Sequence, residues 1–480
     1  MQEENYVVVL DFGSSKISLT VADASLGSPE AILFHKQAAS VGINRGCIVN
    51  PKNVSQILRN LIDEAQNELN IVINRAVVNY PRWKIRTEEV NISLDRTSAD
   101  EYINEEELHT LRDMAITKME QKMEEGQIIC ECIAKSYSTD ELLNVQEEDI
   151  LGAIGSKLMG HFLMFLGSKS MKTNIDKVMN DLGIDAVKYE FTPIIESNFV
   201  LSAEEKMQGV ALLEIGAGIT SVSVYHNGNL RYFNSIPFGG KHVTADIQME
   251  CTVSQTLAEN IKLAYAFCTP DKLQNLSDKI LKIEDPISGS SQEVTLKYLA
   301  EIVNCRMKEI LNACFYMIKE STYGDKLRHG IVLTGGGAQI HCLQAMLSNM
   351  SGLSCRIAYP HYFEEASDCC TEAMLLKACN LKNQGFVSPK PEEVPEEETP
   401  VEETPVEEEK KEANDGEIFS DKEMGTLDNK IKKEDKKSKK EKKKEGENGK
   451  KPNILNQIGS MFSDNFKLFG TDEDDEKDNN

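Results

Sequence analysis

The sequence predicts an α/β protein built from two related halves, and three observations support that prediction. The stretch from Val7 to Val21 predicts a strand, then a tight glycine turn, and then a second strand. The stretch from Gly209 to Tyr225 repeats this design much further along the chain, and the apolar strand 331–334 ends in three consecutive glycines. Such turns bring backbone amides close to a polyphosphate, so we expect a two-domain protein that binds a nucleotide.

The composition is that of a globular protein with further segments outside its core. The chain has 480 residues, of which 40% are hydrophobic and 27% charged, and this length suits several packed domains. Its formal net charge of −25 argues against nucleic-acid binding, because a phosphate backbone requires a cationic surface. Twelve cysteines without zinc or redox motifs favour a reduced, cytosolic compartment. We expect no signal peptide and no transmembrane helix, so any membrane contact would be peripheral.

The first turn, from Asp11 to Lys16, offers an acid, a glycine, two hydroxyl groups and a lysine. Taken alone, it could equally belong to an ordinary hairpin, and its second copy is what favours a nucleotide site. The elements expected after it in the first domain are a strand over 31–34, a glycine turn over 42–50, a helix capped by Asn50 or Asn53, and a strand over 76–80. We expect the first domain to comprise residues 1–80 and 165–203.

Between these two parts the pattern changes. Residues 81–164 contain half-exposed strand candidates over 89–94 and 127–134 around a charged helix near 105–123. This alternation predicts an inserted small α+β unit, although the segment could also simply continue the first domain. The second domain is expected over 204–384, with a long helix over 299–319 and a closing helix over 371–378.

The C-terminal part of the sequence predicts a tether with an anchor. Residues 385–452 form an acidic and then lysine-rich linker that we expect to be disordered. Residues 453–469 then predict an amphipathic helix, followed by an acidic tail over 470–480. Its apolar face consists of Ile454, Leu455, Ile458, Met461, Phe462, Phe466, Leu468 and Phe469. A lysine-rich segment beside such a helix favours docking on an anionic membrane, and the alternative is a lid on the acidic globular part.

Taken together, these motifs resemble the nucleotide site of the actin superfamily, and more closely that of the bacterial FtsA cell-division family. Asp11 to Lys16 resembles the first phosphate loop and Gly209 to Tyr225 the second. Gly42 to Gly46 is similar to a glycine-basic turn, and Leu333 to Gln339 to the adenosine loop. The tether with its terminal helix completes the resemblance, which implies an actin-like two-domain fold with an inserted subdomain.

The resemblance also implies a function, a cofactor set and partners. The residues implied to bind ATP are Asp11, Gly13, Ser14, Ser15, Lys16, Glu214, Gly216, Ala217, Gly218, Glu259, Lys262, Gly335, Gly336 and Gly337. Asp11 and Glu214 would hold Mg²⁺ through water, and Arg306 with Glu309 would receive the C-terminal peptide of FtsZ. The implied protein polymerises head to tail on the cytoplasmic face of the cell membrane, at the division septum, and meets other division proteins there.

The second loop departs from the pattern Asp-Ile-Gly-Gly-Gly-Thr-x-Asp. Glu214 replaces the first acid, Ala217 a glycine, Ile219 the threonine and Ser221 the second acid. These changes remove a hydroxyl group and a carboxylate from the phosphate side, so hydrolysis is more doubtful than binding. Glu196 could orient a water or simply face the cleft.

Alternatives remain open at the sequence level. Glu259 with Lys262, and Arg306 with Glu309, could instead be ion pairs on solvated helix faces. An actin-like ATPase, a kinase of the same superfamily or a pilus-assembly adaptor of the PilM type would share the loops. We predict a nucleotide-dependent scaffold because the long tether and terminal helix suit FtsA better.

Overall fold

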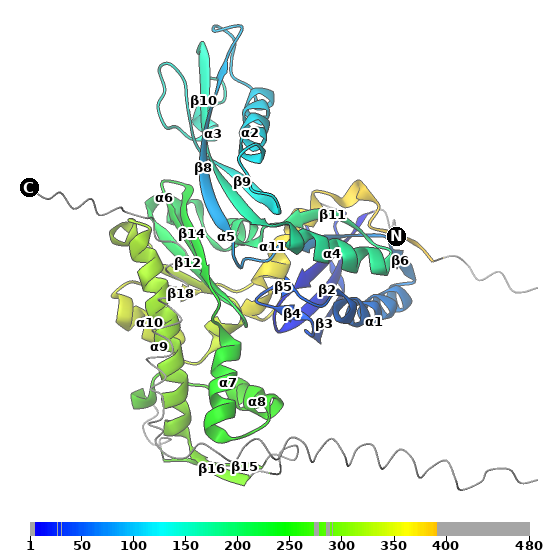
Figure 1. Cartoon of the computed structure of the whole chain (residues 1–480), viewed down its shortest axis with the longest axis vertical. Helices are drawn as coiled ribbons and strands as arrows, with labels where there is room; N and C mark the ends of the chain where they lie inside the picture. Colours follow the sequence, from blue (N-terminus) through cyan, green and yellow to red (C-terminus); the bar gives the residue numbers. More distant parts are fainter. Residues whose placement is uncertain are drawn as a thin grey trace, which may run out of the picture. The chain divides into compact units, whose positions relative to one another are not determined.

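The computed structural model describes residues 5–25, 27–29, 31–272, 278–284, 289 and 291–390. Every described element lies within residues 1–394 (Figure 1). The predicted anchor helix over 453–469 and its acidic tail lie outside the described residues, as does most of the predicted linker. Among the described helices, none is both long and apolar enough to cross a bilayer.

The first domain contains a five-stranded sheet in the order β11-β7-β1-β2-β3. Its strands are β1 (Tyr6–Phe12), β2 (Lys16–Asp23), β3 (Ala31–Ala39), β7 (Arg75–Asn79) and β11 (Asp185–Glu190). The first three are antiparallel, whereas β7 runs parallel to β1 and to β11. All but one of the side chains of β1 are buried, as expected for a strand covered on both faces.

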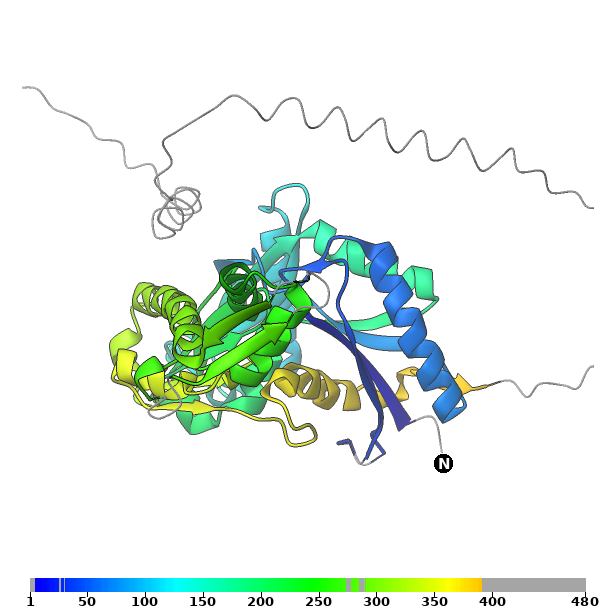
Figure 2. The same ribbon diagram turned by 90° about the horizontal axis from the view of Figure 1, so that it is seen from below.

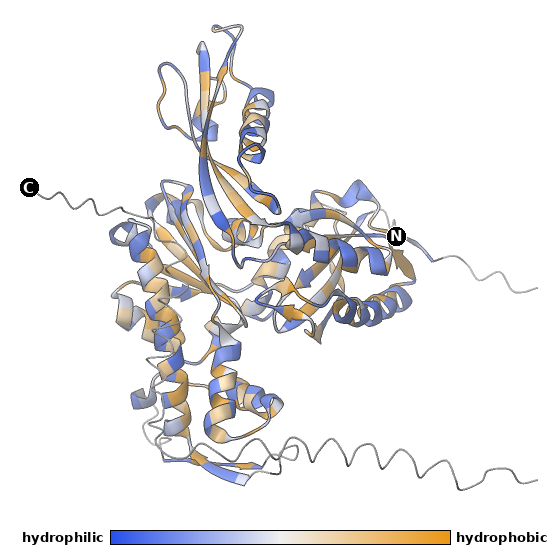
Figure 3. Ribbon diagram, in the orientation of Figure 1, coloured by the Kyte–Doolittle hydropathy of each residue, from blue (hydrophilic) through white to orange (hydrophobic). Residues whose placement is uncertain are grey.

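Helices cover both faces of this sheet. On one face lie α1 (Pro51–Leu69) and α4 (Lys169–Leu182), and on the other α5 (Thr192–Val200) and α11 (Cys369–Cys379). Figure 2 shows α1 and α11 on opposite sides of the dark blue strands. Asn50 caps α1, because its side chain accepts a hydrogen bond from the amide of Asn53. The polar side of α1 faces outward and is blue in Figure 3.

The C-terminal end of the described chain packs in the first domain. The prediction had placed residues up to 384 in the second domain. Helix α11 is buried along almost its whole length and packs with the core of the first domain. The strand β19 (Val387–Pro389) pairs with β6 (Ile71–Ile73) where the linker was expected to have begun. Phe386 anchors this end, since its side chain is fully buried.

The inserted unit is a separate small α+β layer with its own core. Its elements are β8 (Arg86–Asp95), α2 (Glu105–Glu120), β9 (Gln127–Ser138), α3 (Glu147–Ile150) and β10 (Lys157–Ser168). The three strands are antiparallel in the order β8-β10-β9, and α2 packs on them. Strand β10 continues past the predicted boundary at residue 164, because its apolar run keeps pairing with β9 up to Ser168.

The second domain repeats the topology of the first. Its five-stranded sheet has the order β14-β13-β12-β17-β18 and comprises β12 (Val210–Ile215), β13 (Thr220–His226), β14 (Asn229–Ile236), β17 (Ile331–Thr334) and β18 (Cys355–Ile357). The hairpin β12–β13 pairs through β12 with the parallel strand β17, just as the hairpin β1–β2 pairs through β1 with the parallel strand β7. The internal duplication expected from the sequence is therefore present in the topology.

The remaining elements complete this domain. They are α6 (Ala203–Gln208), α7 (Gly240–Cys251), α8 (Gln255–Tyr265), α9 (Leu296–Glu320), α10 (Leu343–Ser351) and the hairpin of β15 (Ile280–Glu284) with β16 (Ser291–Thr295). In the first domain, the short strands β4 (Ile43–Asn44) and β5 (Cys47–Ile48) also pair with each other. Helix α9 packs against α7 and β13, and its buried face forms the centre of the second core. Thus both glycine hairpins stand on separate, well-packed sheets.

Candidate functional site

The first glycine turn joins β1 to β2. The amide of Gly13 donates to the carbonyl of Lys16 at 3.0 Å, which closes the turn and places Ser14 and Ser15 at its tip. The amides of these two residues therefore point outside the ladder, as in a turn that cradles an anion. Glycine is required at position 13, because a Cβ there would lie 2.6 Å from the carbonyl oxygen of Lys16.

The second glycine turn joins β12 to β13 and has the same closure. The amide of Gly216 donates to the carbonyl of Ile219 at 2.9 Å, so Ala217 and Gly218 lie at the tip. The two turns meet tip to tip, since a Cβ on Gly218 would lie 2.8 Å from Oγ of Ser14. Two turns from two domains that meet at their tips have the geometry of a clamp.

The glycine-basic turn also reaches the first tip. Gly46 donates from its amide to Oγ of Ser14 at 2.7 Å. Lys241, at the start of α7, donates from Nζ to the carbonyl of Ser14 at 2.5 Å. Burial lowers the pKa of Lys241. Lys241 of the second domain thus contacts the first glycine turn.

The triple glycine follows β17 and lies beside the end of β12. A Cβ on Gly335 would lie 2.6 Å from the carbonyl oxygen of Ile215, and one on Gly337 would lie 2.4 Å from Cγ2 of the same residue. Gly335 also has a φ of +81°, which favours glycine. Gly336 has more room, since the nearest atom to its Cβ position is 3.6 Å away. Two of the three glycines are therefore required by packing against the second turn.

Glu259 and Lys262 lie on α8 and form an ion pair of 2.8 Å. The Lys262 side chain is only 12% exposed, and its Nζ also donates to Oγ1 of Thr244 at 3.1 Å. Gly240, whose carbonyl lies 3.4 Å from this Nζ, donates its amide to Gly216 in the second turn. The pair therefore faces the base of the second turn, and the alternative of a solvated helix face does not describe Lys262.

The first acid, Asp11, is fully engaged by protein donors. Asn79 donates from Nδ2 to Oδ1 at 2.9 Å, and Thr371 of α11 donates from Oγ1 to Oδ2 at 3.1 Å. Burial raises the pKa of Asp11, and the nearby charge of Arg82 opposes that rise. Asp11 therefore ties β1 to β7 and α11.

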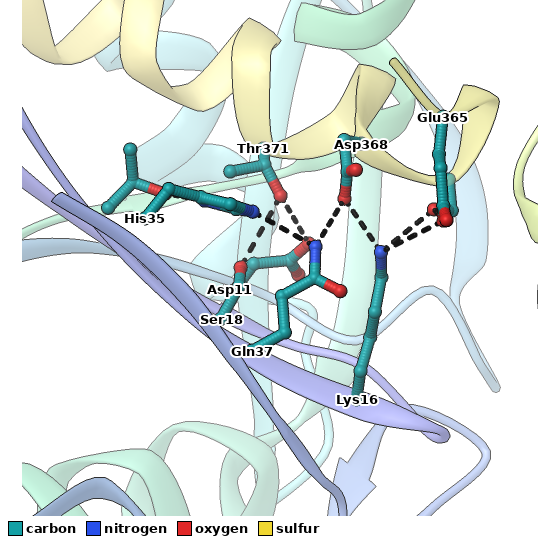
Figure 4. A network of polar contacts seen from close by, with 10 residues as sticks. Asp11, Lys16, Ser18, His35, Gln37, Glu365, Asp368 and Thr371 are labelled. Carbon is teal, nitrogen blue, oxygen red and sulfur yellow. Dashed lines mark hydrogen bonds and ion pairs between the residues drawn. The ribbon is translucent and has the colours of Figure 1, made fainter. Parts of the chain in front are cut away.

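Lys16, the cation of the first turn, points away from the tips and toward the segment before α11. Its Nζ donates to Oδ1 of Asp368 at 2.7 Å and to Oγ of Ser367 at 2.8 Å, and Glu365 lies 3.9 Å away. Figure 4 shows Lys16 and Gln37 converging on Asp368. A phosphate group that binds Lys16 would have to compete with this carboxylate.

Arg82 is the central group that the sequence did not indicate. Its guanidinium forms an ion pair with Glu214, lies 3.7 Å from Oε2 of Glu196, and donates from Nε to Oγ1 of Thr192 at 2.7 Å. The residue is 7% exposed. Arg82 therefore joins the acid of the second turn to α5 of the first domain.

Glu196, considered from the sequence as a residue that could orient a water, is 1% exposed. Its Oε2 has no hydrogen-bond partner in the described part of the chain, so Arg82 is the neighbour that balances its charge. Burial raises its pKa, and Arg82 opposes that rise. Glu196 is a buried counter-ion of Arg82 and does not face an open cleft.

These contacts decide how well a divalent metal fits the two acids. Both oxygens of Asp11 accept hydrogen bonds, and Glu214 is held by Arg82 and by Oγ of Ser221 at 3.2 Å. Over the described ranges, no cluster of three or more His, Cys, Asp or Glu side chains is arranged to ligate a metal. Mg²⁺ between Asp11 and Glu214 therefore does not fit this arrangement, because the guanidinium of Arg82 already pairs with Glu214 and its charge also acts on Asp11.

Arg306 and Glu309 are not brought to the turns. Arg306, on α9, holds Asp246 of α7 through Nε and Nη2 at 2.6 and 2.8 Å, and Glu309 through Nη1 at 2.8 Å. Its side chain is 13% exposed. This cluster fastens α7 to α9 and presents little free positive charge to an acidic peptide.

Some residues of the site have weak sequence signals. Arg82 stands in the short buried run after β7, where a lone arginine between apolar residues is a hint of an internal ion pair. Asp368 precedes the apolar helix α11, and an acid there looks like a simple N-terminal residue. Lys241 follows two glycines and resembles an exposed turn residue. Their partners are far along the chain, so no spacing rule could pair them.

The chain is similar to known proteins both in sequence and in fold. The family model described as "Cell division protein FtsA" matches residues 211–379. Proteins of that name from Pseudomonas aeruginosa and Bacillus subtilis are 26% and 25% identical; the alignments cover 77% and 75% of this chain and 86% and 80% of theirs. A chain of the PilM-PilN type IV pilus biogenesis complex covers 78% of this chain and 98% of its own length, with a TM-score of 0.50 at 13% identity.

These matches confirm two predictions from the sequence. The structural likeness to a chain of that pilus complex agrees with the duplicated sheets and shows the fold alone. The family model and the named relatives support the resemblance that the glycine turns indicated. The chain is similar in sequence to proteins named "Cell division protein FtsA", and its α/β fold is actin-like.

Proposed function

We propose that the chain is an ATP-binding, actin-like scaffold of cell division that assembles on the cytoplasmic membrane and tethers FtsZ to it. The observation that carries the nucleotide part is the meeting of two glycine turns from two domains, with Ser14 opposite Gly218. Amides at both tips would hold phosphates, and the triple glycine beside the second turn would lie next to the nucleoside.

In this proposal ATP acts as a clamp that favours one arrangement of the two domains. The two tips belong to separate sheets, so a ligand that contacts both would stabilise the closed arrangement by its differential affinity. Hydrolysis is not a required step. Ile219 and Ser221 supply no acid on the second turn, and Glu196 is committed to Arg82.

The membrane and FtsZ parts rest on the sequence and on the relatives. The apolar face predicted over 453–469 and the lysine-rich segment before it would bind an anionic bilayer reversibly, and assembly would add avidity. Contact of an acidic FtsZ peptide with Arg306 and Glu309 would have to compete with Asp246, which holds Arg306 on two sides.

Vesicle pelleting with the full chain tests this proposal. We expect the chain to pellet with vesicles that contain anionic lipid, and to carry FtsZ with it, more strongly in the presence of ATP. Deletion of residues 453–480 should abolish pelleting, whereas deletion of 470–480 alone, the matched control, should not. If the chain without 453–480 still pelleted, or if FtsZ remained in the supernatant with the full chain, the scaffold proposal would be wrong.

A further inference from the structure

Arg82 lies among several carboxylates near the point where the two glycine turns meet. Three carboxylates gather there, Asp11 and Glu196 from the first domain and Glu214 from the second. Arg82 supplies the positive charge that faces them, and its side chain is 9% exposed. The positive charge of Arg82 offsets part of the negative charge that a triphosphate at the turns would meet.

The arginine is held in place before any ligand arrives. Oγ of Ser235, in β14, donates to the carbonyl of Arg82 at 2.9 Å, and Thr192 accepts from Nε. A guanidinium has five N–H donors, so the contacts to Thr192, Glu214 and Glu196 leave some of them for a further anion. A fixed, always charged group with spare donors can serve as a phosphate partner.

We propose that Arg82 is a built-in cation that takes the place of a divalent metal beside the two glycine turns, so that a nucleoside triphosphate binds this chain without Mg²⁺. Only the claim that a nucleoside triphosphate binds without Mg²⁺ rests on the proposed function. The claim that Arg82 takes the place of a metal concerns Arg82 and the three carboxylates, and it can be tested with a metal alone.

The nucleotide arm measures ATP affinity of the full chain in Mg²⁺ and in EDTA. For the natural chain we expect the same affinity in both buffers to within about twofold. Arg82→Gln should weaken binding in EDTA by about tenfold or more, and Mg²⁺ should restore part of the loss. Arg82→Lys, which keeps the charge, should lose less. A natural chain that loses tenfold or more of its affinity in EDTA would overturn the inference and leave nucleotide binding intact.

The metal arm needs no nucleotide and uses Mn²⁺, whose free form is counted by electron paramagnetic resonance. We expect the natural chain to take up no Mn²⁺ at this cluster, and Arg82→Gln to gain one site that Glu214→Gln removes again. Fluorescence of Trp83, the single tryptophan, checks that each variant is folded. Uptake by the natural chain at a site lost in Glu214→Gln, or no uptake by folded Arg82→Gln, would refute the substitution of metal by arginine.

The two arms keep two failures apart. If ATP binds in neither buffer, the nucleotide part of the proposed function fails, while the Mn²⁺ result still decides the role of Arg82. If ATP binds only with Mg²⁺, the proposed function stands and the inference fails.

Discussion

Replacement of Phe165 by alanine should loosen the junction between the inserted unit and both domains. Phe165 lies in β10 and is fully buried. Its ring lies 4.8 Å from that of Phe191, just before α5, and 5.8 Å from that of Phe233 in β14. The rings of Phe191 and Phe233 are themselves 5.4 Å apart. These three residues, which we name the aromatic junction, join the insert, the first domain and the second.

The magnitude follows from burial and from the ring contacts. A buried phenylalanine replaced by alanine costs about 3–5 kcal/mol, because apolar contacts are lost and a cavity remains. Each aromatic pair contributes about 0.5–1.5 kcal/mol beyond burial, and Phe165 takes part in two of them. Because the measured cost of such a replacement already includes the lost ring contacts, we expect Phe165→Ala to lie at the upper end of that range and to lower the free energy of unfolding by about 4–5 kcal/mol.

Urea unfolding followed by the fluorescence of Trp83 measures this loss, since Trp83 lies between β7 and β8 at the root of the insert. Tyr102→Ala is the matched control, because Tyr102 is an aromatic residue of the same unit that is 75% exposed. The control should change stability by less than about 0.5 kcal/mol. A loss below about 1 kcal/mol in Phe165→Ala would refute the structural role of the aromatic junction.

Two further predictions concern the triple glycine and pH. Gly337→Ala should destabilise the second domain and Gly336→Ala should be tolerated, because only the first would force a Cβ against Ile215; equal urea midpoints would contradict this packing. Hydrogen bonds from Arg96 hold the pKa of Glu107 below its usual value. That pair therefore stabilises the folded insert above the pKa of unfolded glutamate, and its contribution is lost as the pH falls through the lower folded-state value. Glu107→Gln should flatten the dependence of the urea midpoint on pH between about pH 5 and pH 3, and an unchanged slope would rule this pair out.

The local features of the fold were predictable from the sequence. The strand, turn and strand around Gly13 show their apolar runs and their glycine directly, and so do those around Gly216. Helix α1 was predicted with its cap because its apolar residues recur at helical spacing after Asn50. These features depend on neighbours within a few residues, where spacing rules are informative.

The features that were missed depend on distant partners. Helix α11 joins the first domain although it follows the last strand of the second. It is buried except at Leu376 and Lys377, so it has no broad polar face to show its orientation. Arg82 and Glu214 are far apart in sequence and meet only in the folded chain. The pairing of Lys16 with Asp368 has the same origin. Such contacts follow from topology and not from local pattern.

The central claim is that the two glycine turns form one nucleotide site, and a crystal structure of the full chain with ATP tests it most directly. We predict the triphosphate between the tip at Ser14 and Ser15 and the tip at Ala217 and Gly218. Density for ATP elsewhere, for instance in the cavity of about 590 Å³ lined by residues 338–345 and Tyr359 among others, would contradict the account. Two empty turns at saturating ATP would contradict it equally.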